Sequence, residues 1–236
     1  MIDIKIVDWI CNSCFLKILL ISCLVFTGVP LAHAQVDATF GVKGTGMISS
    51  FQGDDSDALG DLFESGAPAG IDYSYAVRPG FGAGVFVEFA FDDVDFVSLR
   101  PEVGYVQRGD KREDDSGSTT YAFTAKVDYL EIPLLLKLDF GGEAYLVAGP
   151  SVGFNIGSPE VELQNLEFIN TGEDTLVLED IGIETEDTVY GAIIGFGAIV
   201  DNVWAELRYE HGVSDVFAGP ADVQNQGFSL TAGFQF

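Results

Sequence analysis

Residues 226–236, QGFSLTAGFQF, alternate apolar side chains with polar or small ones up to the last position of the sequence. Successive side chains of a β-strand point to opposite faces, so this segment predicts a strand with one apolar and one polar face. The apolar face carries Phe228, Leu230, Ala232, Phe234 and Phe236. The polar face carries Ser229, Thr231, Gly233 and Gln235.

The same period of two recurs upstream and predicts seven more strands, at 37–48, 79–91, 96–107, 127–140, 143–156, 187–200 and 202–213. Short connections follow the second, fourth and sixth strands. Long connections, at about 49–78, 108–126, 157–186 and 214–225, follow the others. Alternating short turns and long loops with an even strand count are typical of outer-membrane barrels. The expected fold is therefore all-β: an eight-stranded antiparallel up-and-down transmembrane β-barrel with short periplasmic turns and long extracellular loops. A secreted soluble barrel or sandwich is the alternative.

The faces opposite the large aliphatic side chains carry many glycines and charges of both signs. Small residues suit the narrow interior of an eight-stranded barrel, and opposite charges can pair there. The expected lumenal charge network comprises Glu88, Arg100, Glu102, Glu131, Lys137, Asp139, Glu206, Arg208 and Glu210. Such a network either plugs the lumen or forms the path of a gated pore.

Residues 1–34 are interpreted as a cleaved signal peptide, because an apolar stretch precedes Ala32-His33-Ala34, which has the small-x-small pattern of a cleavage site. A single membrane anchor is the alternative. The barrel domain is expected at 35–236, secreted through the inner membrane and integral to the bacterial outer membrane. All three cysteines lie within 1–34, which excludes thiol chemistry from the mature protein. A net charge of −26 argues against nucleic-acid binding.

Several phrases resemble the small porin-like outer-membrane β-barrel proteins of Bacteroidota. They are residues 99–105 (LRPEVGY), 129–137 (YLEIPLLLK), 148–154 (AGPSVGF) and 207–209 (LRY) followed by Gly212. The resemblance implies an eight-stranded outer-membrane barrel and no catalytic residues. It also explains Pro101, Pro133 and Pro150, at which strand bulges or lumenal water are expected because proline lacks a ladder donor. The chain end resembles the assembly signal of such barrels, with Gly233, Phe234 and Phe236 as its residues.

Other groups of residues suggest weaker hypotheses. His211, with Ser214 and Glu210 nearby, could belong to an enzyme that modifies lipid A, or it is an interfacial histidine without a catalytic duty. The acidic loops could bridge Ca²⁺ to lipopolysaccharide, or they form a solvated surface. The basic cluster Arg108, Lys111 and Arg112 could contact lipid phosphates or pair with adjacent carboxylates.

We expect a non-enzymatic integral outer-membrane protein with a structural or surface-interaction role. No cofactor, metal or catalytic residue is expected. The expected partners are outer-membrane lipid, lipopolysaccharide and the barrel-assembly machinery; the protein is expected to be a monomer, and its extracellular partner is unknown. The alternatives are a narrow porin for water or small solutes and, third, the His211-dependent enzyme.

Overall fold

The computed structural model describes residues 36–56, 74–91, 94, 96–114, 121–141, 143–164, 175–178, 183–219 and 221–236. The expected signal peptide, 1–34, lies outside these residues, as does much of the first and third long connections. No helix in this described part of the chain is long and apolar enough to cross a membrane.

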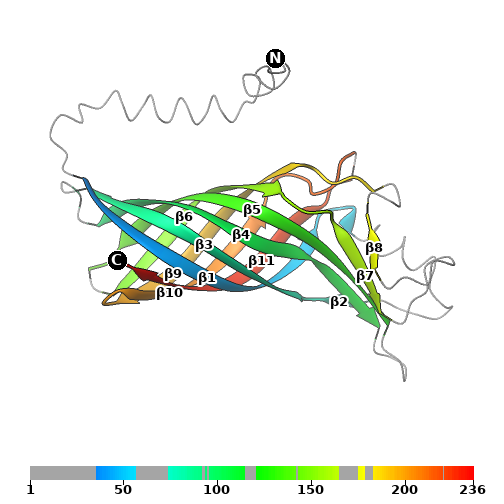
Figure 1. Cartoon of the computed structure of the whole chain (residues 1–236), viewed down its shortest axis with the longest axis horizontal. Helices are drawn as coiled ribbons and strands as arrows, with labels where there is room; N and C mark the ends of the chain where they lie inside the picture. The colour runs from blue at the N-terminus through cyan, green and yellow to red at the C-terminus, as the bar shows by residue number, and fades with distance from the viewer. Residues whose placement is uncertain are drawn as a thin grey trace, which may run out of the picture.

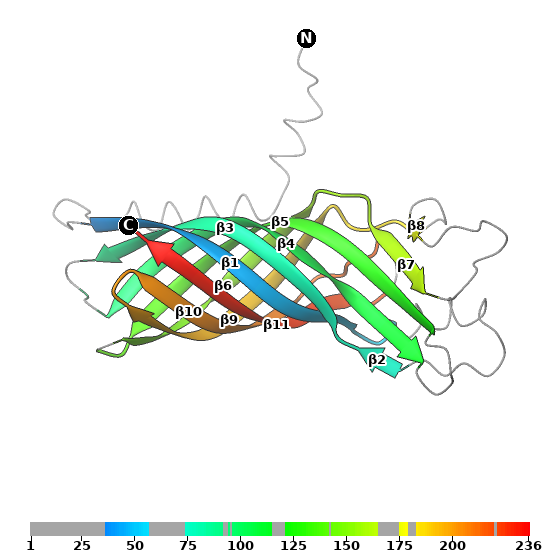
Figure 2. The ribbon, with the colours of Figure 1, turned by 60° about the horizontal axis from the view of Figure 1, so that its bottom comes forward.

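Eight long antiparallel strands form a closed barrel (Figures 1 and 2). Their order around the barrel is β4-β3-β1-β11-β10-β9-β6-β5, and pairing between β5 and β4 closes the ring. The prediction of an eight-stranded antiparallel barrel is confirmed. The strands are β1 (Val36–Gln52), β3 (Arg78–Phe91), β4 (Val97–Asp114), β5 (Tyr121–Asp139), β6 (Ala144–Asn155), β9 (Thr188–Val200), β10 (Val203–Gly212) and β11 (Gln224–Gln235).

The short turns and the C-terminus lie at one end of the barrel, here named the turn end (Figure 1). Val200 pairs with Val203, so only Asp201 and Asn202 connect β9 to β10. Asp201 has a φ of 54°, a left-handed conformation that aspartate tolerates better than most residues. Asn202 Nδ2 donates to the backbone oxygen of Gln235 at 2.7 Å, which attaches this turn to the last strand. The opposite end is named the loop end.

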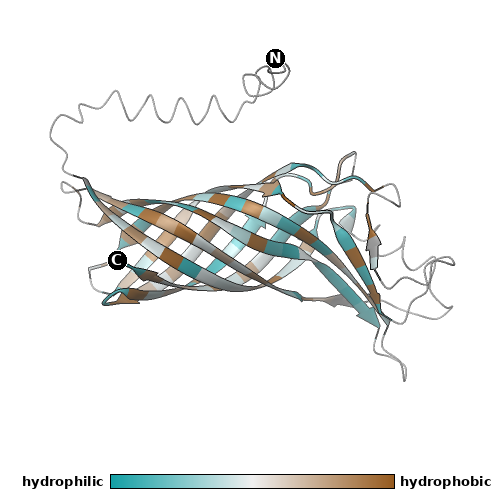
Figure 3. Cartoon of the chain, viewed as in Figure 1, coloured by the Kyte–Doolittle hydropathy of each residue, from teal (hydrophilic) through white to brown (hydrophobic). Residues whose placement is uncertain are grey.

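The two faces of the wall differ as the alternation predicts. Leu230 is 63% exposed on the outside, whereas the next residue, Thr231, is fully buried inside. Large apolar residues of β1, β3, β4, β5, β9, β10 and β11 are exposed in the same way, and Figure 3 shows hydrophobic positions along the barrel wall. An exposed apolar wall is stable only in contact with lipid, so the barrel is built to sit in a membrane.

The strands cross the barrel without bulges at the three prolines, so the prediction of bulges is wrong, and lumenal water at these positions stays a prediction. The pairs Leu99–Leu136 and Gly104–Glu131 lie on either side of Pro101 and keep one register. Each proline instead pairs with one neighbouring strand and interrupts the ladder to the other: Pro101 pairs on β5, Pro133 on β6 and Pro150 on β9. The missing proline N–H therefore leaves one local gap in the hydrogen-bond ladder to one neighbouring strand, and the register does not change.

The expected loop at 108–126 is also wrong, because β4 and β5 continue through most of it and remain paired up to Asp114–Tyr121. Three short strands extend this ribbon: β2 (Ser74–Ala76) on one side, and β7 (Glu160–Gln164) and β8 (Thr175–Val177) on the other. Together the five strands form a sheet that projects past the loop end, named the outer sheet (Figure 2). Its inward residues Phe123, Ala125 and Val127 are buried, so the alternation of inward and outward side chains along β5 continues from the barrel wall into the outer sheet.

Candidate functional site

A cluster of ion pairs occupies the middle of the barrel interior. Arg208 binds Glu102 through two hydrogen bonds: Nη1 lies 2.9 Å from Oε2, and Nη2 lies 2.9 Å from Oε1. Arg208 Nε also donates to Glu206 at 2.7 Å, and Arg100 Nη2 donates to the same carboxylate at 2.5 Å. Lys43 of β1 pairs with Glu102 from a third direction. Bidentate charge-assisted contacts of this kind fix side chains in one geometry.

Aromatic rings surround the central cluster on the side of the turn end. The guanidinium carbon of Arg100 lies 5.0 Å from the ring centre of Trp204 and 5.6 Å from that of Phe86. The Tyr145 hydroxyl donates to Glu206 at 2.8 Å. Cation–π attraction of this kind is strongest where water is excluded, and the rings of Trp204 and Phe86 are both buried.

A second group of charges lies at the turn end. Lys137 Nζ is 2.8 Å from Glu88 and 3.4 Å from Asp139, and it lies 4.7 Å from the ring centre of Tyr145. The Ser98 hydroxyl donates to Glu88 at 2.9 Å. Asp139 is the most exposed member of the group, so this end of the network meets solvent at the mouth of the barrel.

A third group lies toward the loop end and contains a residue that sequence reasoning placed elsewhere. Arg108 was expected in a loop, but its Nη2 points into the barrel, 2.5 Å from Glu131, and also pairs with Glu210. The Ser229 hydroxyl donates to Glu210 at 3.0 Å. Arg108 keeps the even parity of lumenal residues in β4, which is the signal that would have identified it.

Each cation of the three charge groups pairs with at least one carboxylate. Because an unpaired buried charge is costly, this pairing stabilises a filled interior. All nine residues of the expected network face the interior, but they form three groups, and Lys43 and Arg108 were missed. The interior cations are Lys43, Arg100, Arg108, Lys137 and Arg208, and the buried carboxylates that pair with them are Glu88, Glu102, Glu131, Glu206 and Glu210.

An apolar core lies above the third group and fills the loop end of the barrel. It combines side chains of the wall with side chains of the outer sheet and of the segment before β11. Phe51 and Phe217 meet edge to face within it, with ring centres 5.5 Å apart. This core is named the outer cap; its members are Met47, Phe51, Val106, Phe123, Ala125, Val127, Tyr129, Val161, Leu163, Leu178, Val189, Val216, Phe217 and Val223.

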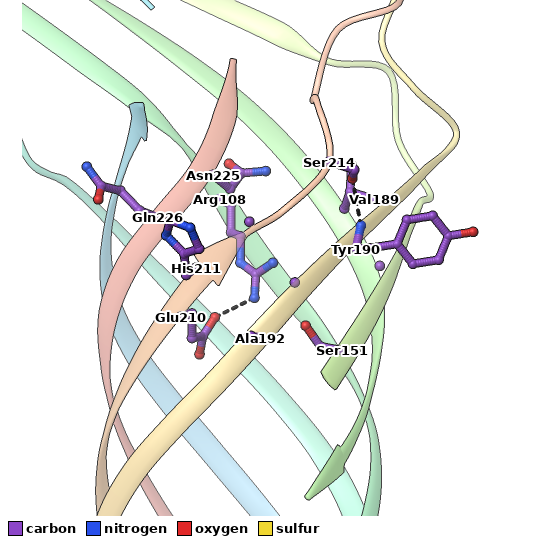
Figure 4. A pocket seen from close by; sticks show the side chains of 13 residues that line it. Arg108, Ser151, Val189, Tyr190, Ala192, Glu210, His211, Ser214, Asn225 and Gln226 are labelled. Atoms are coloured by element: carbon purple, nitrogen blue, oxygen red, sulfur yellow. Dashed lines mark hydrogen bonds and ion pairs between the residues drawn. The ribbon is translucent and has the colours of Figure 1, made fainter. Parts of the chain in front are cut away.

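Two cavities among the described residues of the barrel are about the size of single water molecules. One of about 20 Å³ lies between Lys43, Arg208, Glu131 and Glu210. Another of about 10 Å³ lies beside Arg108 and Glu210 (Figure 4). About 10–15 Å³ is needed to hold one water, so these cavities have room for isolated waters rather than a continuous column.

Lys111 and Arg112, the other two residues of the basic cluster that includes Arg108, pair with neighbours in the outer sheet. Arg112 Nε lies 3.2 Å from Asp110 Oδ2, and Lys111 pairs with Glu113. Burial raises the pKa of the Asp110 carboxyl, and the Arg112 guanidinium partly opposes that rise. The described contacts of Lys111 and Arg112 therefore favour pairing with adjacent carboxylates over contact with lipid phosphates.

His211 and Ser214 are not brought into hydrogen-bonding contact. The Ser214 hydroxyl accepts a bond from the Tyr190 backbone N–H at 2.8 Å, as the dashed line in Figure 4 shows. His211 Nδ1 lies 2.9 Å from Gln52 Nε2 and 3.4 Å from the Tyr209 hydroxyl. The described contacts thus give His211 polar neighbours and no serine partner.

In the part of the chain that is described, no group of three or more histidine, cysteine or acidic residues could hold a metal ion. Much of the acidic first and third connections lies outside that part, so Ca²⁺ bridging stays a hypothesis.

The predicted assembly signal lies at the turn end. Gly233 faces the interior, and a Cβ there would lie 2.4 Å from Trp204 Cζ2, so the ring needs a glycine at this position. Phe234 and Phe236 are exposed on the outer face, and the Phe236 N–H donates to Phe40 at 2.9 Å. Their role in recognition stays a prediction.

A closed barrel with an apolar outer wall and a charged interior defines an integral β-barrel membrane protein. The family model of the outer membrane protein beta-barrel domain matches residues 33–218, and the chain belongs to this family. The protein is therefore an integral protein of the bacterial outer membrane, with the turn end periplasmic and the loop end extracellular.

Solved outer-membrane barrels are similar to this chain, at low identity. Neisserial surface protein A is 14% identical with a TM-score of 0.46, covering 85% of this chain and 99% of its own. Ail, the attachment invasion locus protein of Yersinia pestis, is 12% identical with a TM-score of 0.43 over 85% and 99%. OprG from Pseudomonas aeruginosa is 10% identical with a TM-score of 0.40 over 84% and 96%. No curated protein sequence matches significantly.

Proposed function

We propose that this protein is a closed, non-enzymatic barrel that anchors the outer sheet at the cell surface, where the sheet and the acidic loops meet the environment or a partner. One observation carries the proposal: the interior is filled along its length by paired charges, and the outer cap lies above them. Eight strands leave space mainly for side chains, which supports a structural plug rather than a pore.

The outer sheet supports a surface role because it is built as a folded unit. Val161 and Leu163 of β7 and Leu178 after β8 pack on the buried face of the β4–β5 ribbon. A segment that buries its own apolar side chains holds a fixed shape, so it can present the same surface to each partner. The expected contacts with lipopolysaccharide and the assembly machinery belong to this proposal.

Stopped-flow light scattering of proteoliposomes tests the closed lumen against the narrow porin. We expect the refolded barrel to leave the permeability to water and to small sugars at the level of empty vesicles. Faster shrinkage or swelling that scales with the amount of folded barrel would favour the porin. A matched variant, Lys126→Ala, alters an exposed pair of the outer sheet and serves as the control for the preparation.

The non-enzymatic part of the proposal rests on the contacts of His211 and Ser214 described above. Cells that carry His211→Ala are expected to have an unchanged lipid A profile by mass spectrometry. Loss of a lipid A modification in that variant, with a normal amount of barrel in the membrane, would favour the enzyme.

A further inference from the structure

An apolar groove crosses the outer wall of the barrel in its extracellular half. It has a volume of about 490 Å³, and Gly46, Ile48, Pro79, Leu230 and Leu207 are among the residues that line it. The space over Gly46 is open, because a Cβ there would meet nothing within 4 Å. These residues point away from the interior, so the groove opens toward lipid.

A row of polar side chains follows directly beyond the groove on the same outer face. Ser50, Gln226 and His211 are neighbours across β1, β11 and β10, two positions further along each strand than Ile48, Phe228 and Tyr209. Gln226 Nε2 donates to the Ser50 hydroxyl at 3.3 Å, and Gln52 Nε2 lies 2.9 Å from His211 Nδ1. Among the described residues, the contacts of the exposed His211 ring to Gln52 and to Tyr209 are both made by Nδ1.

Carboxylates stand beyond the polar row, farther from the membrane. Gln224 Nε2 donates to Asp215 at 2.9 Å and also to Asp222. The Asp222 backbone N–H donates to Asp55 at 2.9 Å. None of the ion pairs found in the described part of the chain neutralises Asp55, Asp215 or Asp222. Along one line the surface therefore changes from apolar side chains, to hydrogen-bonding side chains, to carboxylates.

We propose that this surface binds a zwitterionic aminophospholipid. One acyl chain lies in the groove over Gly46, the phosphate and ester oxygens meet His211 and Gln226, and the ammonium group meets Asp222. The order of chemical groups along such a lipid matches the order of side chains along the wall. Lipid tails are as apolar as the groove, so packing and the polar contacts, not hydrophobicity, must give selectivity. An anionic headgroup would instead meet repulsion from the carboxylates.

Native mass spectrometry of the detergent-solubilised barrel, with dioleoyl phosphatidylethanolamine or dioleoyl phosphatidylglycerol added, tests the proposal. We expect the wild-type barrel to retain one phosphatidylethanolamine several-fold more often than phosphatidylglycerol. Gly46→Leu fills the groove and should abolish this retention; a Cβ at Gly46 meets nothing within 4 Å, so the barrel is expected to fold. Asp222→Asn should bring the two lipids to equal retention without abolishing binding.

Ala198→Leu is the control, since it also places a leucine on the outer wall, away from the groove, and should retain the lipid as the wild type does. Four results would overturn the proposal. The first is equal retention of both lipids by the wild type, and the second is undiminished retention by folded Gly46→Leu. The third is preferential retention of added lipid A, and the fourth is a dimer that forms without lipid and disappears in Gly46→Leu.

Discussion

Arg208 and Glu102 form a two-bonded ion pair across the interior of the barrel, with both N–O distances at 2.9 Å. The two residues come from β10 and β4, which are not neighbours in the wall. Glu102 also binds Lys43 and lies 3.0 Å from Arg100, so one carboxylate holds three cations. This pair links opposite walls and makes the interior a single packed unit.

Removing the Arg208 side chain should therefore lower the free energy of unfolding. Arg208→Ala leaves Glu102 and Glu206 buried with one fewer cation, and breaking a buried pair in this way costs about 3–5 kcal/mol of unfolding free energy. Urea titration in detergent micelles measures the loss. Lys126→Ala, at an exposed pair, should change the unfolding free energy by less than about 1 kcal/mol. Equal losses in both variants would show that the central cluster does not stabilise the barrel.

The glycines of the wall should differ sharply in how well they tolerate replacement by a larger residue. A Cβ at Gly197 would lie 2.5 Å from Glu206 Cγ and 2.7 Å from Tyr145 Cζ, so Gly197→Val should overpack the interior and cost about 1–3 kcal/mol. Gly44 faces outward with nothing within 4 Å, and Gly44→Val should fold as the wild type does. The folded fraction by heat-modifiable gel mobility compares the two. If Gly197→Val folds as well as Gly44→Val, the interior beside residue 197 has room for a valine side chain.

The outer cap should protect the extracellular end from proteolysis. Phe217→Ala removes the ring that packs on Phe51, and deleting a buried aromatic typically costs about 3–5 kcal/mol. Protease added outside proteoliposomes should cut the variant within the outer sheet faster than the wild type, while the membrane strands stay intact. Phe140→Ala, at a side chain 58% exposed on the periplasmic end, is the control and should leave the cleavage rate unchanged. The same cleavage rate in all three proteins would argue against a packed cap.

The last residue should matter for assembly more than for stability. Phe236 is 69% exposed, so Phe236→Ala should lose little packing within the barrel itself. In cells the variant should show a several-fold lower amount of folded barrel in the outer membrane, whereas refolding into detergent should be unaffected. Phe96→Ala, at a residue 60% exposed, controls for the loss of an outer aromatic side chain. A normal level of Phe236→Ala in the membrane would remove the assembly signal from this account.

The alternation of side chains was enough to predict the barrel, because period two and short turns repeat in every hairpin. It did not reveal the outer sheet, since the charged run Arg108–Asp114 hides the apolar alternation of its partner strand. For the interior, the alternation predicts charged side chains on the polar face, and the structure pairs those side chains with one another in three groups. The sequence did not reveal that Phe86 and Trp204 lie in the lumen. The only sequence signal for a large lumenal ring is a glycine on a neighbouring strand that makes room for it, such as Gly41 beside Phe86.

The central claim is that the interior is closed, and single-channel conductance of the refolded barrel in a planar bilayer tests it most directly. With a closed interior, the membrane should stay silent although folded barrel is present. A variant that combines Arg108→Ala with Phe217→Ala loosens the third charge group and the outer cap, and it is the variant most expected to conduct. Discrete wild-type current steps whose size or ion selectivity changes when Glu102, Glu131 or Lys137 is substituted would contradict the claim and make the protein a pore.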